Sequence, residues 1–221
     1  MPIAHRGSAP FNNVAWHEIF EELSGNTTAD TTAAIASLSF YACIRGASAP
    51  SMSFLRSASN AAITVGVGYR PVGGSLIGRT VSEIIDTFSS RTLAANSTNA
   101  DTGSITTTGN DRLLVAAAAV ADATETTLFD AATGATTDSG AGTDVANHPT
   151  SNTWKRRGAN ATASGSDVGV GIADAIMTTA GPTGTVQCAA GDDSRHAMAV
   201  IAFKHPLSFK RRSNLLLLGA G

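Results

Sequence analysis

The sequence predicts an all-β fold, an antiparallel β-sandwich of jelly-roll type with extended N- and C-terminal arms. Three observations predict it: short alternating apolar and polar segments recur along the chain, turn-forming residues separate them, and no convincing long helical pattern is present. The chain has 221 residues, which suffices for one such domain with its own core. We therefore expect an N-terminal arm at 1–33, a β-sandwich domain at 34–206 and a C-terminal arm at 207–221.

The N-terminal arm has one patterned segment among its turn formers, VAWHEIFEEL (14–23). Its apolar residues fall at helical spacing with glutamates on the other side, and Gly25 would end the helix. A strand fits the same segment nearly as well. The apolar residues, which we expect to contact a partner more weakly than the C-terminal arm does, are Trp16, Ile19, Phe20 and Leu23.

Two segments in the first half of the domain alternate as half-buried strands do. They are ASLSFYACIR (36–45) and AAITVGVGYR (61–70). MSFL (52–55) predicts a further short strand, and TVSEIIDTF (80–88) fits either a strand or a helical turn. The residues expected to share one apolar face within each of the first two strands are Leu38, Phe40, Ala42 and Ile44, and Ile63, Val65, Val67 and Tyr69.

Longer strand signals follow in the second half. SITTTGNDRLLVAAAAVA (104–121) predicts a short strand, a turn at Gly-Asn-Asp and a long alanine-rich strand. TETTLF (124–129) could form a hairpin with that strand. The polar segment 130–152 is long for a loop in a compact domain, and such loops are usually functional or flexible.

Four further strands complete the expected set. NTWKRRG (152–158) is anchored by Trp154, and SDVGVGIADAIM (166–177) alternates valine and isoleucine with glycine and alanine. GTVQCAA (184–190) precedes HAMAVIAFK (196–204). The last segment is apolar on both faces, which is typical of a central strand.

Composition points to a thin core and to association with other subunits. The chain is 43% hydrophobic, but 39 residues are alanine and only 5% are aromatic, so large apolar side chains are scarce. We expect subunit packing to supplement the buried area. The charged fraction is 14% and the formal net charge is −2, a balance that gives no reason to expect nucleic acid or acidic substrates.

No pattern of catalytic or metal-binding residues is evident in the sequence. It has no GxSxG, no P-loop lysine after its glycine-rich stretches, and no HxxxH or CxxC, so we expect no enzyme, no cofactor and no metal. Several aspartates leave calcium open as an alternative, although solvated turn-forming residues explain them better. These are Asp130, Asp138, Asp144, Asp192 and Asp193.

The two cysteines, Cys43 and Cys188, are expected to be buried free thiols, with a single bridge between them as the alternative. The first residues lack the apolar region of a signal peptide, and no stretch reaches the ~20 apolar residues of a membrane helix. We therefore expect no membrane association.

A Lys-Arg-Arg run occurs twice, at 155–157 beside Trp154 and at 210–212. Basic and aromatic residues together can bind nucleic acid. One tryptophan beside three cations, in a chain of negative net charge, instead favours strand-edge charges or salt bridges between subunits at the first run. We expect no nucleic-acid partner.

Four motifs in the second half of the chain occur in a recognisable order: TTTGNDRLLV (106–115), WKRR (154–157), AGPTGTVQCAA (180–190) and AMAVIAFKHP (197–206). This order resembles a β-sandwich module of tailed-bacteriophage virion structural proteins. The resemblance covers about half the chain, and the first half and the final tail depart from it. It implies a non-enzymatic structural part of a phage particle, assembled in the host cytoplasm.

The leading hypothesis is a capsid decoration or cement protein, which binds across neighbouring capsid subunits and stabilises the shell. Its expected partners are other virion proteins, namely the major capsid protein or tail and portal-vertex proteins, and a closed homo-trimer is favoured on symmetry grounds. One alternative is a tail, collar or fibre component that contacts a host receptor. An alternative from another class is a carbohydrate-binding module or carbohydrate-active protein, since β-sandwiches host both.

The segment FKRRSNLLLLGAG (209–221) combines three cations with four consecutive leucines. Four leucines are too few for a membrane anchor, and the charged and apolar residues stand in sequential blocks. We expect a hydrophobic strand or plug that inserts into a neighbouring subunit while the cations meet acidic surface at its rim. The expected partner-binding residues are Phe209, Lys210, Arg211, Arg212, Leu215, Leu216, Leu217 and Leu218.

Overall fold

The structure is a computed structural model of the chain. It describes residues 2–5, 17–23, 36–44, 62–71, 76, 79–121, 154–162, 168–184, 186–204 and 209–210. The predicted strands at 52–55 and 124–129, and the polar segment 130–152, lie outside these ranges.

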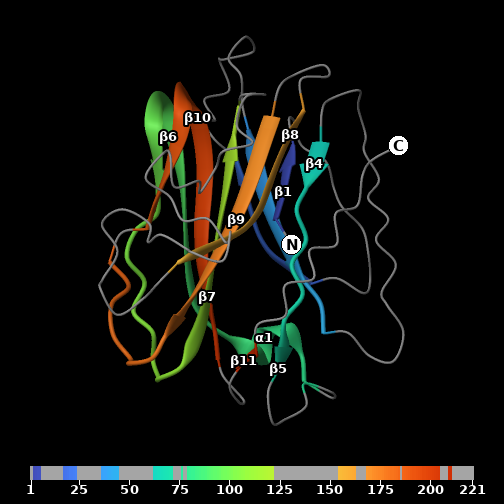
Figure 1. The fold of residues 1–221 in the computed structure, drawn as a ribbon, viewed down its shortest axis with the longest axis vertical. Helices are drawn as coiled ribbons and strands as arrows, with labels where there is room; N and C mark the ends of the chain where they lie inside the picture. Colours follow the sequence, from blue (N-terminus) through green and yellow to red (C-terminus); the bar gives the residue numbers. More distant parts are fainter. Residues whose placement is uncertain are drawn as a thin grey trace.

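Strands make up most of the described residues, and the one helix among them is the single turn α1 (Val81–Ile84) (Figure 1). This confirms the all-β class. The strands are β1 (Pro2–His5), β2 (His17–Leu23), β3 (Ser37–Ala42), β4 (Ala62–Thr64), β5 (Arg70–Pro71), β6 (Ile85–Asp101), β7 (Arg112–Val120), β8 (Lys155–Thr162), β9 (Val168–Met177), β10 (Gln187–Phe203) and β11 (Phe209–Lys210).

The strands form two larger sheets and one small one. The first sheet has the order β2-β3-β1-β4, the second β6-β10-β7-β9-β8, and the third pairs β11 with β5. Every strand pairing recorded in the three sheets is antiparallel. The apolar segment predicted as a central strand lies in β10, which has β6 on one side and β7 on the other.

Residues 85–120 and 168–203 behave as the two arms of one long antiparallel ribbon. As the residue numbers increase along the first arm, the residue numbers of the paired positions on the second arm decrease. The partners include Ile85↔Phe203, Asp101↔Gln187, Thr106↔Pro182, Arg112↔Met177 and Val120↔Gly169. β6 and β7 on the first arm therefore pair with β10 and β9 on the second arm, along one continuous ribbon.

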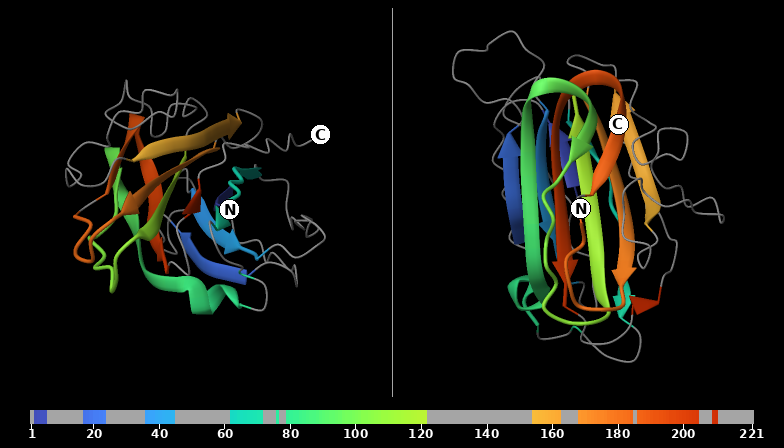
Figure 2. Two further views of the ribbon diagram at one scale, coloured as in Figure 1. Left: turned by 60° about the horizontal axis from the view of Figure 1, so that its bottom comes forward. Right: turned by 90° about the vertical axis from the view of Figure 1, so that its left-hand side faces the viewer.

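The ribbon folds back on itself. Phe203 pairs with Ile85 on one side and with Leu113 on the other, so the first arm has returned to its starting level by Leu113. Figure 2 shows β6 and β10 curving over together at one end of the sheet. A Cβ added at Gly103 would lie 3.4 Å from Ser89 Oγ, so the segment that follows β6 turns back and lies against β6 itself.

Two apolar layers lie on opposite faces of the five-stranded sheet. The layer that faces the four-stranded sheet contains Leu38, Phe40, Ile63, Val65, Leu113, Val115, Ala117, Ala119, Val168, Val170, Ile172, Ala197, Ala199, Ile201 and Phe203 among its members. The layer on the outer face contains Ile105, Leu114, Ala116, Ala118, Val120, Trp154, Ala173, Ala175, Met177, Val186, Met198, Val200 and Ala202. Ile105 and Val186 lie on the returning part of the ribbon, so this part helps to cover the outer face.

β7 is buried on both faces. Residues 113–120 are at most 3% exposed, and the four alanines from Ala116 to Ala119 are fully buried. Alternate alanines belong to the two layers, because successive side chains of a strand point to opposite faces. Small side chains at these positions let both layers approach the sheet closely.

The strand patterns predicted around β3, β7, β9 and β10 are confirmed, and Trp154 is fully buried as an anchor would be. The segment 80–88 contains both expected structures, the turn α1 followed by the start of β6. In 61–70 only Ala62–Thr64 is a strand before β5, but Val67 and Tyr69 still pack against the inner layer.

Three expectations were wrong. The helix favoured over 14–23 is the strand β2, because Phe20 and its neighbours pair with β3 and this pairing overrides the helical spacing. The two strands expected at 184–190 and 196–204 are one strand, β10, with register shifts between Ala189 and His196. β6 also extends further than predicted, because β10 pairs with its polar second half as far as Asp101.

We expect Ala117→Leu to lower the free energy of unfolding by about 1–3 kcal/mol, because three added carbons have no space between the closely packed layers. Urea denaturation followed by circular dichroism would measure the change. Thr178→Leu, at an exposed position, is the matched control and should have little effect. Equal midpoints for Ala117→Leu and the wild type would contradict the close packing of β7.

Candidate functional site

Two of the motifs singled out in the sequence, TTTGNDRLLV and AGPTGTVQCAA, lie side by side in the structure. Their backbones continue the β6–β10 ladder past the ends of both strands. Thr107 N donates to Gly181 O at 2.9 Å, and Thr183 N donates to Ile105 O at 2.8 Å. The β-bridge between Thr106 and Pro182 lies between these bonds.

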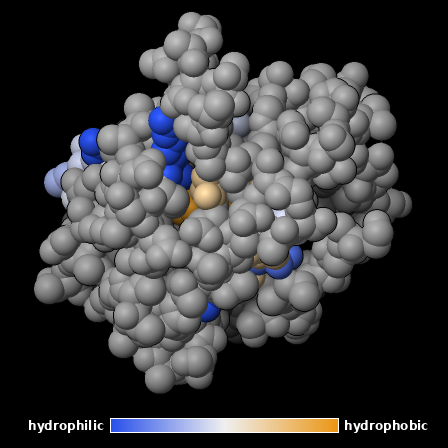
Figure 3. Space-filling view, turned by 90° about the horizontal axis from the view of Figure 1, so that it is seen from above, coloured by the Kyte–Doolittle hydropathy of each residue, from blue (hydrophilic) through white to orange (hydrophobic). Residues whose placement is uncertain are grey.

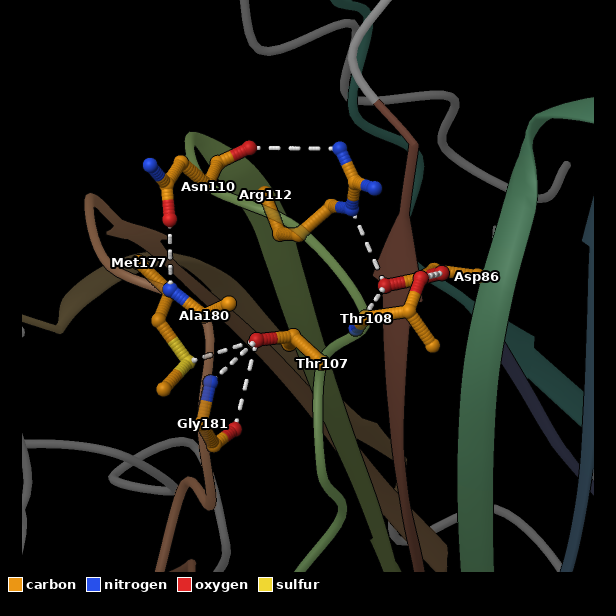
Figure 4. Close-up of polar contacts among 8 residues, drawn as sticks. All are labelled: Asp86, Thr107, Thr108, Asn110, Arg112, Met177, Ala180 and Gly181. Atoms are coloured by element: carbon orange, nitrogen blue, oxygen red, sulfur yellow. Dashed lines mark hydrogen bonds and ion pairs between the residues drawn. The ribbon is translucent and has the colours of Figure 1, made fainter.

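Side chains add to this backbone pairing (Figure 4). Asn110 Oδ1 accepts a hydrogen bond from Ala180 N at 2.8 Å. The Thr107 hydroxyl accepts from Gly181 N at 3.2 Å and can donate to Gly181 O at 3.2 Å or to Met177 Sδ at 3.4 Å. These bonds hold the turn that precedes β7 against the loop that follows β9.

Asp86 ties the same turn to the first residues of β6. Its carboxylate accepts from Thr108 N at 2.9 Å, from the Thr108 hydroxyl, and from Arg112 Nε at 2.9 Å. The Asp86 side chain is 1% exposed and that of Arg112 is 14% exposed. Burial raises the pKa of Asp86, but the hydrogen bonds from Thr108 and Arg112 outweigh it and hold the pKa below its ordinary value.

The turn itself is shaped to admit Arg112. A Cβ at Gly109 would lie 2.8 Å from Arg112 Cζ, so glycine leaves the space that the guanidinium occupies. Asp111 has a φ of 54°, a left-handed conformation that Asp and Asn tolerate better than most residues. We call Asp86, Thr107, Thr108, Asn110 and Arg112 the ribbon clasp, because they hold the ribbon in its folded-back arrangement.

A second polar network lies at the boundary between the two large sheets. Arg157 on β8 donates to Asp174 from Nε at 2.6 Å and from a second guanidinium nitrogen at 2.9 Å. Tyr69 donates its hydroxyl to the same carboxylate at 2.8 Å, and the Asp174 side chain is 1% exposed. The register of β8 against β9 shifts between Arg156 and Gly158, so Arg157 is the extra residue of a bulge that turns its side chain toward Asp174.

The first Lys-Arg-Arg run lies on β8, an outer strand of the five-stranded sheet, as predicted for strand-edge charges. Arg157 of this run is paired within its own chain, so its charge needs no salt bridge to another subunit. Both oxygens of the Asp174 carboxylate accept hydrogen bonds from Arg157 or Tyr69, so this arrangement serves packing and orientation.

The structure describes part of the predicted C-terminal binding segment. Phe209 pairs with Pro71, and Lys210 pairs with Arg70, in the two-stranded sheet of β11 and β5. The remaining predicted residues, Arg211, Arg212, Leu215, Leu216, Leu217 and Leu218, lie outside the described residues. The structure therefore fixes where this segment leaves the domain.

The predicted N-terminal binding residues lie in or next to β2, an outer strand of its sheet. Ile19 is half-buried and packs against the protein's own inner layer. Phe20 pairs with Phe40 in register, and Leu23 pairs with Ser37. Trp16 lies outside the described residues.

Other candidate groups give no sign of a ligand site. Within the described ranges, no three His, Cys, Asp or Glu side chains are grouped as metal ligands, and no helix is long and apolar enough to cross a membrane. Of the aspartates considered for calcium, Asp192 and Asp193 lie in β10, and the other three lie outside the described residues. Cys43 is a free, half-buried thiol whose pKa is raised by burial, so the alternative bridge to Cys188 is not formed.

Large apolar side chains are mostly covered wherever the structure describes the side chain. Among those residues, Phe88 is the one large apolar residue that is exposed, at 48%. Seen from above in Figure 3, the coloured residues that reach the surface are mainly hydrophilic, with small apolar areas between them. Trp154 and Tyr41 are buried, at 0% and 4% exposure.

Comparison with known proteins adds no relative. No family model matches the chain, and no curated protein or solved structure matches it. The resemblance in motif order therefore depends on the residues of this chain alone.

The contacts of Asp86 predict how the stability of the fold depends on pH. Because its pKa is lowered in the folded state, the carboxylate contributes stability above its ordinary pKa of 3.8 and loses that contribution as the pH falls through the folded value. Asp86→Asn should therefore lower the free energy of unfolding by about 1–2 kcal/mol at neutral pH, and the difference from the wild type should shrink below the ordinary pKa. Urea denaturation across this pH range would measure it.

Asp111→Asn is the control for Asp86→Asn, because Asp111 is exposed and Asn also tolerates its left-handed backbone. This variant should unfold at nearly the wild-type urea concentration. A loss of stability for Asp86→Asn that is equal at neutral and acidic pH would contradict a role for the charged carboxylate.

The close approach of Arg112 to Gly109 predicts the effect of adding a side chain there. We expect Gly109→Ala to displace the Arg112 guanidinium from Asp86 and to cost about 1–2 kcal/mol of folding stability. Because both changes break the same contact, Gly109→Ala and Asp86→Asn should combine to much less than the total of their separate costs. Gly103→Ala, where the added Cβ meets Ser89 Oγ only at ordinary contact distance, is the control. Full additivity in the double variant would show that Gly109 acts elsewhere.

Proposed function

We propose that the chain is a non-enzymatic structural protein of a tailed-phage particle, most specifically a capsid decoration or cement protein that binds across neighbouring capsid subunits. The observation that carries the proposal is the position of the shared motifs. TTTGNDRLLV and AGPTGTVQCAA meet along the ribbon, and the first supplies most of the clasp. In this proposal the motifs that resemble the phage modules form the folding framework of the chain.

We also propose that the architecture is a β-sandwich wound in the manner of a jelly roll. One supporting feature is the apolar layer between the four- and five-stranded sheets. The other is the long ribbon, whose first arm returns at Leu113 to the level of Ile85. Such a framework presents arms and loops at its ends without needing a reactive centre.

The polar groups of the described residues support a structural role. The two best-developed polar networks, at Asp86 and Asp174, are built from paired carboxylates and arginines that hold segments of the fold together. The carbohydrate-binding alternative needs exposed aromatic platforms beside carboxylates. Trp154 and Tyr41 are buried and the Tyr69 hydroxyl bonds to Asp174, which leaves these three rings poorly suited to stack on a sugar.

In this proposal the C-terminal arm makes the principal contact with the partner. The pairing of β11 with β5 sets its starting point, and the cations and leucines that follow would bind an acidic rim and an apolar groove on a neighbouring virion protein. A homo-trimer on the particle would repeat this contact around a symmetry axis.

The test uses phage particles purified from a culture of the phage whose genome encodes the chain. An antibody against the full chain, detected with gold in electron microscopy, should label the whole shell. Label confined to the tail, collar or fibres would support the tail alternative instead, and particles without label would overturn the virion role.

A variant that ends at Pro206 tests the C-terminal arm. Added to particles that lack the protein, it should fail to restore resistance to heat and to osmotic shock, whereas the full chain should restore both. The variant's circular dichroism spectrum provides the control for folding. Binding of the shortened chain with wild-type affinity would contradict the role of the arm.

A further inference from the structure

β1 is the first of the described strands, yet it lies inside its sheet, with β4 beside it (Figure 1). It pairs with β3 along one edge and with β4 along the other, so that Ile3 stands in register between Ser39 and Thr64. Among the described strands, β4 pairs with β1 alone. β1 therefore joins β4 to the rest of the four-stranded sheet.

The place that β1 fills between β3 and β4, which we call the β1 slot, is bordered by the apolar core. Ala4 stands in register between Leu38 and Ile63, and both of these side chains are buried in the inner layer. β1 also lies against β7 and β9 of the five-stranded sheet. An empty slot would leave backbone groups of β3 and β4 unpaired and uncover part of the inner layer, so the fold needs a strand there.

The strand that fills this slot is short. β1 has four residues, and Pro2 has no backbone N–H to donate, so its departure breaks few hydrogen bonds. Residues 6–16 are its connection to the strands that follow. If β1 enters the slot of another copy, all of its pairings form again there, and the exchange costs no strand pairing.

Residues 6–16 have more length than the connection within one copy requires. β1 and β2 lie on opposite edges of β3, where His5 is level with Ser37 and His17 is level with Ala42. Two strand spacings and the rise from Ser37 to Ala42 separate His5 from His17 by about 19 Å. Eleven extended residues span about 40 Å, which exceeds the radius of gyration of about 17 Å for a compact chain of this length. β1 can therefore reach a copy packed beside its own.

We propose that β1 is exchanged between copies of this chain, so that the β1 slot of one copy accepts Pro2–His5 of a second copy in the register described above. The occupant is a second copy because these four residues already fit the slot on both edges and residues 6–16 give them the reach. Each copy gives a strand and receives one at a different surface. Such head-to-tail contacts close into rings, which agrees with the homo-trimer of the proposed function, but the exchange does not rest on that function.

The test uses cysteine bridges between full chains in which Cys43 and Cys188 are replaced by serine. Ile3 and Thr64 are paired positions and Thr64 is half-buried, so cysteines there suit the geometry of a disulfide. One chain carries Ile3→Cys, and a second, tagged chain carries Thr64→Cys. Mixed at high concentration and oxidised, they should form a covalent pair on a non-reducing gel, with the bridge assigned by peptide mass spectrometry. This bridge requires β1 of the first chain to lie in the slot of the second.

A tagged chain with Thr178→Cys is the matched control, because Thr178 is exposed and lies outside the four-stranded sheet. Bridges to this chain should be roughly tenfold fewer, since chance encounters rarely meet the geometry of a disulfide. A single chain that carries both Ile3→Cys and Thr64→Cys, oxidised at low concentration, should form the bridge internally. This positive control shows that both cysteines fold in register.

Three results would overturn the proposal. Equal bridging to the Thr64→Cys and Thr178→Cys chains would show that the contact is unspecific. No bridge between chains, although the doubly substituted chain forms its internal bridge, would show that β1 stays in its own copy. Failure of the internal bridge would contradict the position of β1 itself. The measurements use the purified chain without particles, so the exchange and the virion role can fail separately.

Discussion

The fold depends on the close approach of two apolar layers to the alanines of β7. This strand is paired on both edges and buried on both faces, so bulky side chains at Ala116–Ala119 would push the layers apart. The small residues make the folded-back ribbon possible, since its returning part helps to cover the outer face of the sheet. They also limit the stabilisation, because a buried alanine removes little apolar area from water.

Polar contacts stand where the chain must be held in one arrangement. The clasp fixes the ribbon where it returns to the level of Asp86, and Arg157 uses a bulge in β8 to reach Asp174 at the boundary of the sheets. Ion pairs this well buried add little net stability, because desolvation offsets their attraction, but removing one partner leaves a costly unpaired charge. The two networks therefore disfavour alternative arrangements more than they deepen the native one.

The sequence predicted the features that depend on local pattern. Alternation located β3 and β9, and continuous apolar runs located β7 and the second half of β10. Glycine with asparagine and aspartate located the turn before Arg112. It failed at 14–23, where pairing with β3 selects a strand, and at the polar second half of β6, which shows no alternation and is paired by β10. The partners of Asp86, Asp174 and Lys210 come from distant parts of the chain, and no spacing rule links them.

The pairing of β11 with β5 joins the domain to its C-terminal arm, and it is a weak joint. Two residues on each strand form a ladder that is too short to be stable by itself. A partner that binds the arm only when the ladder is formed would stabilise the ladder. By linkage, the free energy with which such a partner strengthens the ladder equals the free energy with which the formed ladder favours the partner. Docking of the arm and the fixed starting point of the arm would then reinforce each other, so a short and poorly stabilised sheet suits a contact made on assembly.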